Sequence, residues 1–228
     1  AQAGVPTEFT YYLKPENTAG FDRLAVESAA PVHYMSVARN GADLDAQMDT
    51  TANGFLLHLP RRIRTDQVIE LKFESSVFRQ STRFDVFLQD SRQDDSVRQR
   101  VDAGDASELV ESNTNVVSLP VSRSLFANVE LSSPVITPNG DGINDELQLS
   151  VDLVNVLAPR PLRLRLYDLA GRAVYDRSED GRAGQQQFNW DGRDPDGGRV
   201  APGLYIVEIL VAGDAGDERA RAIISVAY

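Results

Sequence analysis

The alternation of apolar and polar residues in short runs is the feature that most constrains the fold of this chain. In the run "DELQLSVDL", Leu147, Leu149, Val151 and Leu153 stand at every second position. The run "PLRLRLYDL" repeats the pattern, with leucines alternating with arginines and a tyrosine. Successive side chains of a β-strand point to opposite faces, so this period predicts half-buried strands.

Comparable runs fill the first half of the chain. In "QVIELKF", the alternation predicts that Ile69, Leu71 and Phe73 point inward. Clusters of Pro, Gly, Asn and Asp separate the runs, which are "TEFTYYL", "RLAVES", "HYMSVAR", "GFLLHL", "QVIELKFES" and "RFDVFLQD". In the polar segment that follows, helical periodicity is confined to "ASELVESN". The chain is therefore predicted to be all-β.

The length and the spacing of turns predict two domains. A chain of 228 residues is long enough for two domains of about 100 residues each. Short strands with turn signals every ~8–12 residues are typical of immunoglobulin-like sandwiches. We therefore expect two tandem immunoglobulin-like β-sandwiches, at residues 1–128 and 129–228, with the join between Pro120 and Pro134.

Charge and hydropathy argue against several kinds of partner. A net charge of -11 disfavours nucleic acid and anionic lipid, because both attract basic surfaces. The longest apolar stretch, "LYIVEIL", is broken by Glu208 and falls short of the ~18 residues that span a bilayer. Hence no transmembrane segment is expected. Arg61, Arg62 and Arg64 form the one dense basic cluster, expected to be a solvated strand end, with a docking patch as the alternative.

The first residues, "AQAG", suggest export. The chain has no initial methionine, and A-x-A is the small-residue pattern of a signal-peptidase site. A trimmed chain would look the same. We expect an exported protein, in the periplasm or at the cell surface of a bacterium.

Three motifs in the second half carry a family resemblance. In order, "TPNGDGINDELQLS", "LRLYDLAGRAV" and "WDGRDPDGGRVAPGLYIVEI" resemble the Ig-like domain of FlgD, the flagellar hook-capping scaffold. They are similar also to the C-terminal sorting domains of gliding bacteria. The resemblance covers about residues 130–228 and implies a seven-stranded sandwich carried as a module on unrelated proteins. The first half carries no resemblance that we can name.

The loop within the first motif has the spacing of a calcium site. When Gly142 is aligned with the sixth position of an EF-hand-type loop, oxygen ligands are expected at the third, fifth, seventh and ninth positions. These positions fall on Asn139, Asp141, the carbonyl of Ile143, and Asp145. The sequence thus predicts calcium as a metal that this loop could take.

The same loop also fits a tight turn. Thr137 and Gln148 stand where a calcium loop has Asp and Glu, so any affinity would be weak. In the alternative, Asn139 and Asp141 accept hydrogen bonds from nearby backbone N–H groups, and the glycines permit the curvature. Both interpretations stay open at this point.

No motif in the sequence predicts catalysis or a required cofactor. His33 and His58 are isolated, and Trp190 is expected to be a core anchor beside a turn. We expect a non-catalytic structural or protein-interaction module of an exported bacterial protein, acting on other protein chains through its sandwich surfaces. Two alternatives remain. One is an accessory subunit docked on the periplasmic face of a membrane complex, such as an energy-converting or photosynthetic assembly. The other is a carbohydrate-binding or hydrolytic domain.

Overall fold

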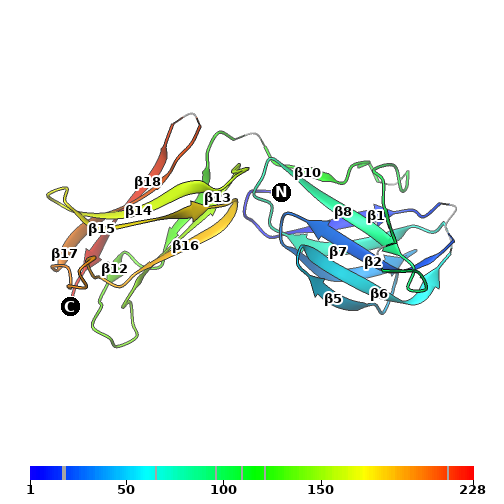
Figure 1. Cartoon of the computed structure of the whole chain (residues 1–228), viewed down its shortest axis with the longest axis horizontal. Coiled ribbons are helices and arrows are strands. Elements are labelled where there is room, and N and C mark those ends of the chain that lie inside the picture. The colour runs from blue at the N-terminus through cyan, green and yellow to red at the C-terminus, as the bar shows by residue number, and fades with distance from the viewer. Residues whose placement is uncertain (17–18, 65, 96, 109, 121, 215) are drawn as a thin grey trace. The chain divides into compact units, whose positions relative to one another are not determined.

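The predicted all-β class is confirmed. The computed structural model describes residues 1–16, 19–64, 66–95, 97–108, 110–120, 122–214 and 216–228, and these residues form strands, turns and connections without a helix. Across these ranges there is accordingly no helix that could span a membrane. Contacts divide the chain into two compact units, Ala1–Pro120 and Val121–Tyr228, both drawn in Figure 1.

The first unit consists of two antiparallel sheets (Figure 1). The smaller sheet has the order β1-β7-β3-β4, and the larger has the order β10-β8-β2-β6-β5, with β9 also paired to β8. The strands are β1 (Thr7–Leu13), β2 (Phe21–Ser28), β3 (Val32–Arg39), β4 (Ala42–Asp43), β5 (Gln47–Thr51), β6 (Gly54–Ile63), β7 (Ile69–Ser75), β8 (Ser81–Gln89), β9 (Arg98–Arg100) and β10 (Val116–Ser118).

Aromatic rings fill much of the core of the first unit. The ring centroids of Phe73 and Phe84 are 5.0 Å apart, and that of Phe9 lies 5.5 Å from Phe84. Ile69 and Leu71, which precede Phe73 in β7, have no exposed surface. The inward face predicted for "QVIELKF" is confirmed.

The second unit is also built from two sheets. One has the order β11-β13-β16, and the other has the order β12-β18-β17-β14-β15. All neighbours are antiparallel except β12 and β18, which are parallel. The strands are β11 (Phe126–Leu131), β12 (Val135–Ile136), β13 (Leu147–Leu153), β14 (Arg160–Asp168), β15 (Ala173–Gly181), β16 (Gly184–Trp190), β17 (Gly203–Val211) and β18 (Glu218–Val226).

The core of the second unit contains the alternating residues of the sequence pattern. The apolar positions of β13, Leu147 to Leu153, are buried, and so is Trp190 at the end of β16. The indole of Trp190 meets the ring of Tyr205 edge-on at 6.1 Å. Strand β11, which spans the predicted boundary at 128/129, pairs with β13 of this unit.

The polar segment at residues 91–115 lies along the first unit. Its short strand β9 pairs with β8. Residues 102–104, 106, 110 and 112–115 line a cavity of about 70 Å³ beside Thr10–Tyr12 of β1. The described residues of "ASELVESN" form no helix, and Leu109 lies outside them. This segment therefore flanks the outer edge of β1.

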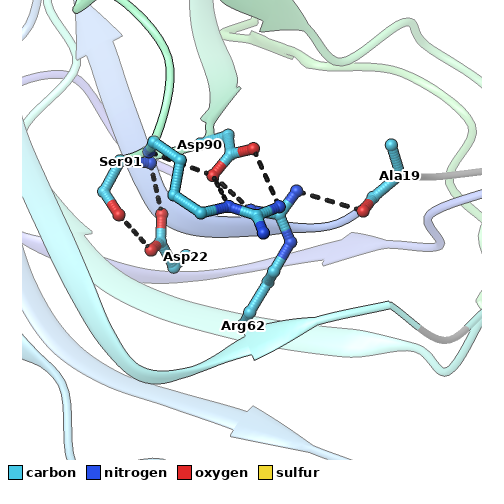
Figure 2. A network of polar contacts seen from close by, with 6 residues as sticks. Ala19, Asp22, Arg62, Asp90 and Ser91 are labelled. Atoms are coloured by element: carbon cyan, nitrogen blue, oxygen red, sulfur yellow. Dashed lines mark hydrogen bonds and ion pairs between the residues drawn. The ribbon is translucent and has the colours of Figure 1, made fainter.

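The basic cluster is not uniformly solvated. Arg61 and Arg64 are exposed, as expected for a strand end. Arg62, by contrast, has a side chain only 14% exposed, and it forms an ion pair with Asp90, whose side chain is 10% exposed. Its Nη2 also donates to the carbonyl of Ala19 at 3.0 Å (Figure 2). The solvated interpretation is therefore wrong for Arg62, because a carboxylate of the β8–β9 connection holds it inward.

The contacts of Arg62 belong to a wider network that fixes the start of the β8–β9 connection. Ser91 donates its backbone N–H to Asp22 of β2 at 2.7 Å, and Arg92 Nε donates to Asp90 at 3.3 Å. Figure 2 shows Arg62 directed towards Asp90, and Ser91 beside Asp22. Hydrogen bonds from Arg62 and then Arg92 hold the pKa of Asp90 well below its ordinary value.

Candidate functional site

The predicted metal ligands lie in one loop of the second unit, Thr137–Glu146, here called the Asx loop. The loop leaves β12 of the five-stranded sheet and enters β13 of the three-stranded sheet. Its ends are tied together by Thr137, whose N–H donates to the carbonyl of Asn144 at 2.8 Å and whose hydroxyl donates to that of Ile143 at 3.0 Å. The loop therefore links the two sheets of the sandwich.

Asp145 organises the middle of the Asx loop. Its two carboxylate oxygens accept the N–H groups of Gly140 and Gly142, each at 2.7 Å. These donors hold the pKa of Asp145 below its ordinary value. The φ angles of Gly140 and Gly142 are +90° and +84°, a region that side chains disfavour, so the glycines permit the fold of this loop.

Asn139 and Asp141 make the hydrogen bonds of consecutive Asx turns. Asn139 Oδ1 accepts the N–H of Asp141 at 2.9 Å, and Asp141 Oδ1 accepts that of Ile143 at 2.8 Å. The structure thus brings together the four predicted residues, Asn139, Asp141, Ile143 and Asp145, in a hydrogen-bonded turn. In the part of the chain that the structure describes, no three His, Asp or Glu side chains gather as metal ligands. A carboxylate oxygen can accept more than one contact, so calcium at this loop stays a prediction.

A second loop packs against the first. It follows Trp190, whose indole N–H donates to the carbonyl of Arg193 at 2.7 Å, and it closes where Gly198 donates its N–H to Asp194 at 2.8 Å. The interpretation of Trp190 as a core anchor beside a turn is confirmed. A Cβ at Gly192 would lie 2.7 Å from Cγ of Pro138 in the Asx loop. The two loops are therefore in close contact.

The last residues of the chain complete the same end of the sandwich. Tyr228 donates its hydroxyl to the carbonyl of Val200 at 2.9 Å, and the guanidinium of Arg199 lies 5.1 Å from its ring centroid. The N–H of Ala227 donates to the carbonyl of Ile136, just before the Asx loop. We call this group, residues 137–146, 191–200 and 227–228, the loop end. Sequence reasoning missed Tyr228, for which the sequence signal was only an aromatic residue two positions after β18.

A row of alternating charge crosses the five-stranded sheet. The register places Arg221, Glu208, Arg165 and Asp176 opposite one another on β18, β17, β14 and β15. Glu208 is only 3% exposed and accepts the Nε–H of Arg221 at 2.7 Å. Opposite charges on facing strands stabilise the sheet. The sequence signal was Glu208 itself, an acid inside an apolar run.

The chemistry of the loop end is that of a polar surface with fixed shape. Its carboxylates accept hydrogen bonds from its own backbone, and Ile143 is 66% exposed on it.

His33 and His58 lie in the first unit, where His58 contacts Asp49 at 2.8 Å.

The second unit matches a known family. Residues 129–226 match the model described as the CHU_C Type IX secretion signal domain, a non-catalytic C-terminal sorting domain of exported proteins. The chain is therefore that of an exported protein, associated with the cell surface or the periplasm. The match supports the resemblance to the sorting domains of gliding bacteria, whereas the resemblance to FlgD stays a prediction. No curated protein matches the chain.

Solved structures give distant likenesses. PorZ, a surface component of the type IX secretion system of Porphyromonas gingivalis, is 20% identical over 44% of this chain and 11% of its own, with a TM-score of 0.29. Dimeric latent PorU from the same organism is 12% identical over 97% of this chain and 20% of its own, with a TM-score of 0.38. A β-glucuronidase of Parabacteroides merdae is 13% identical over 98% and 28%, with a TM-score of 0.33. The chain spans less than a third of each of these structures.

Proposed function

We propose that this chain is a non-catalytic, two-domain part of an exported surface protein. In this proposal, the second domain is the sorting signal that the type IX secretion machinery recognises, and the first domain contacts other proteins. The family match at residues 129–226 is the observation that carries the proposal. The matched residues lie within the second compact unit, so the proposed sorting signal is a folded sandwich.

We propose that the secretion machinery recognises this sorting signal at the loop end. A receptor that reads a folded domain needs a surface whose shape is set before binding, because ordering a loop on binding costs affinity. The hydrogen bonds of Asp145 and Asp194 supply that order. Ile143, exposed on this surface, offers the apolar contact that commonly anchors an interface.

A secretion assay tests whether the second domain acts as a sorting signal. A reporter protein is fused ahead of residues 121–228, or ahead of residues 1–120, in a bacterium that has type IX secretion. We expect the first fusion to reach the cell surface or the medium and the second to stay inside, and a strain without the secretion system should retain both. Equal export of the two fusions would contradict the proposal.

A matched pair of variants tests the place of recognition. Ile143→Asp, at the loop end, is expected to lower export without changing the melting temperature, because the side chain is 66% exposed. Leu157→Asp is the control, since Leu157 is 83% exposed and follows the other end of β13. If both variants are exported equally well, recognition lies elsewhere on the domain.

A further inference from the structure

Among the residues that the structure describes, no strand pairs with the outer edge of β5 in the first domain. Strand β5 ends the six-stranded sheet, with β6 on its inner side. The carbonyl of Asn53 accepts the N–H of Ser28 in β2 at 2.9 Å. Backbone groups alternate along an antiparallel strand, so Gly54 and Leu56 of β6 direct theirs towards β5.

The register then identifies the groups at the free edge. Gly54 and Leu56 lie opposite Thr51 and Asp49, and these two pairs exchange the hydrogen bonds of the ladder. The residues between and beside them, Met48 and Thr50, therefore turn their N–H and C=O groups away from β6. Such a row of backbone groups is a template for pairing with another strand.

The face of β5 that points towards the core is open as well. Met48 and Thr50 lie opposite the buried Leu57 and Phe55, so all four side chains point to one face of the sheet. In the described part of the chain, β4 pairs with β3 only at Ala38 and Arg39, so the start of β3 has no outer neighbour. Met48 is therefore 44% exposed. A groove of about 520 Å³ results, lined among others by Ala30, Val32, Tyr34, Met48, Thr50 and Phe55.

A carboxylate lies on the face of β5 opposite the groove. Asp49 is paired with Leu56 of β6, between the groove-lining Met48 and Thr50, so its side chain points to that other face. There it is 70% exposed and contacts His58. A segment lying along β5 would therefore meet apolar side chains on the groove face and negative charge on the other face.

We propose that an extended segment of another protein adds as a strand to the free edge of β5. The backbone groups of Met48 and Thr50 pair with it, which requires an extended partner backbone. Every second side chain of the segment is apolar and enters the groove, and the basic side chains between them point to the other face, beside Asp49. A second copy of this chain fits less well, since a two-fold pair centred on Asp49 sets like charges opposite each other.

The probe for this site is a short synthetic peptide of alternating valine and lysine, added to the full chain. A peptide of the same composition with its valines and lysines in separate blocks is the control for charge. We expect the alternating peptide to bind, by calorimetry, and to slow hydrogen exchange at the amides of Met48 and Thr50. Equal binding of the block peptide, or protection of other strands alone, would overturn the proposal.

Two methionines give matched variants. Met48→Glu puts a charge into the groove, whereas Met35→Glu adds the same charge at a residue of β3 that is 49% exposed and does not line the groove. We expect Met48→Glu to weaken peptide binding at least about tenfold and Met35→Glu to leave it nearly unchanged. Equal effects, or tighter binding by both variants, would show non-specific attraction and overturn the proposal.

A third variant tests the backbone contact directly. Thr50→Pro removes an N–H that points away from β6, so the fold should persist, since proline is tolerated at such edge positions. We expect the peptide to lose its binding, while the melting temperature stays close to that of the parent chain. Sedimentation of the chain without peptide shows whether it dimerises. A dimer in which hydrogen exchange at residues 47–51 is slowed would assign the edge to a second copy of the chain instead.

Discussion

The larger sheets of the two domains end in different kinds of edge strand. In the five-stranded sheet of the second domain, the edge strand β12 has two residues, and β15 carries Asp176, Arg177, Glu179 and Asp180 among its nine. Short and highly charged edges resist pairing with other chains. In the six-stranded sheet of the first domain, the edge strand β5 carries a single charge in five residues and borders an open groove. We therefore expect a division of roles, in which the larger sheet of the first domain accepts a further strand and that of the second domain does not.

Each domain has a core of its own, and Trp190→Ala tests whether the two cores are independent. Trp190 is 2% exposed in the core of the second domain. Its truncation leaves a cavity, so we expect the loss of about 3–5 kcal/mol of that domain's unfolding free energy. In calorimetry, the transition of the second domain should move down while that of the first stays in place.

Phe73→Ala is the reciprocal control. Phe73 is 1% exposed in the core of the first domain, so this variant should move the other transition by a similar amount. If either substitution shifts both transitions together, the two units unfold as one and the proposed division of roles loses its basis.

Gly192→Ala tests the contact between the two loops of the loop end. Gly192 has φ +76°, and a Cβ there would lie 2.7 Å from Pro138, whereas Gly171 has φ +80° and open space around it. Alanine at Gly171 should cost about 1 kcal/mol for the left-handed backbone alone. Gly192→Ala adds the clash and should cost about 2–3 kcal/mol. Chemical denaturation measures both, and equal losses would show that the contact between the two loops is unimportant.

How far the sequence predicts this molecule depends on the range of the contacts. The period of two in β13 and β7 and the turn at Trp190 are local, and each is present as predicted. The contacts of Arg62 and Tyr228 join residues 28 positions apart in the chain. No local pattern marks such pairs, because they depend on which strands become neighbours. The exposed face of β5 was missed for the same reason, since β4 decides it.

Asp90 should make the stability of the first domain depend on pH in the acid range. The folded-state pKa of Asp90 is depressed, so its stabilising contribution is complete above the unfolded value of about 3.9 and is lost as pH falls below it. Asp90→Asn should therefore lower the melting temperature of the first domain at neutral pH. The gap between variant and parent should narrow as the pH falls from about 5 to 3. A gap that stays constant with pH would contradict this role, and the transition of the second domain serves as the internal control.

Calcium is expected to have a smaller effect on the second domain than Gly192→Ala. If the Asx loop binds calcium with a dissociation constant near 1 mM, as weak extracellular sites do, about 10 mM calcium should stabilise this domain by roughly 1.4 kcal/mol. The melting temperature of the second transition should rise, and that of the first should not. Asp141→Asn should abolish the rise, because it removes a charged ligand but keeps an oxygen that can accept the N–H of Ile143. Asp196→Asn, an exposed carboxylate in the neighbouring loop, should keep it. Identical melting curves in calcium and in chelator would leave the loop as a turn, held by Asp145 without a metal.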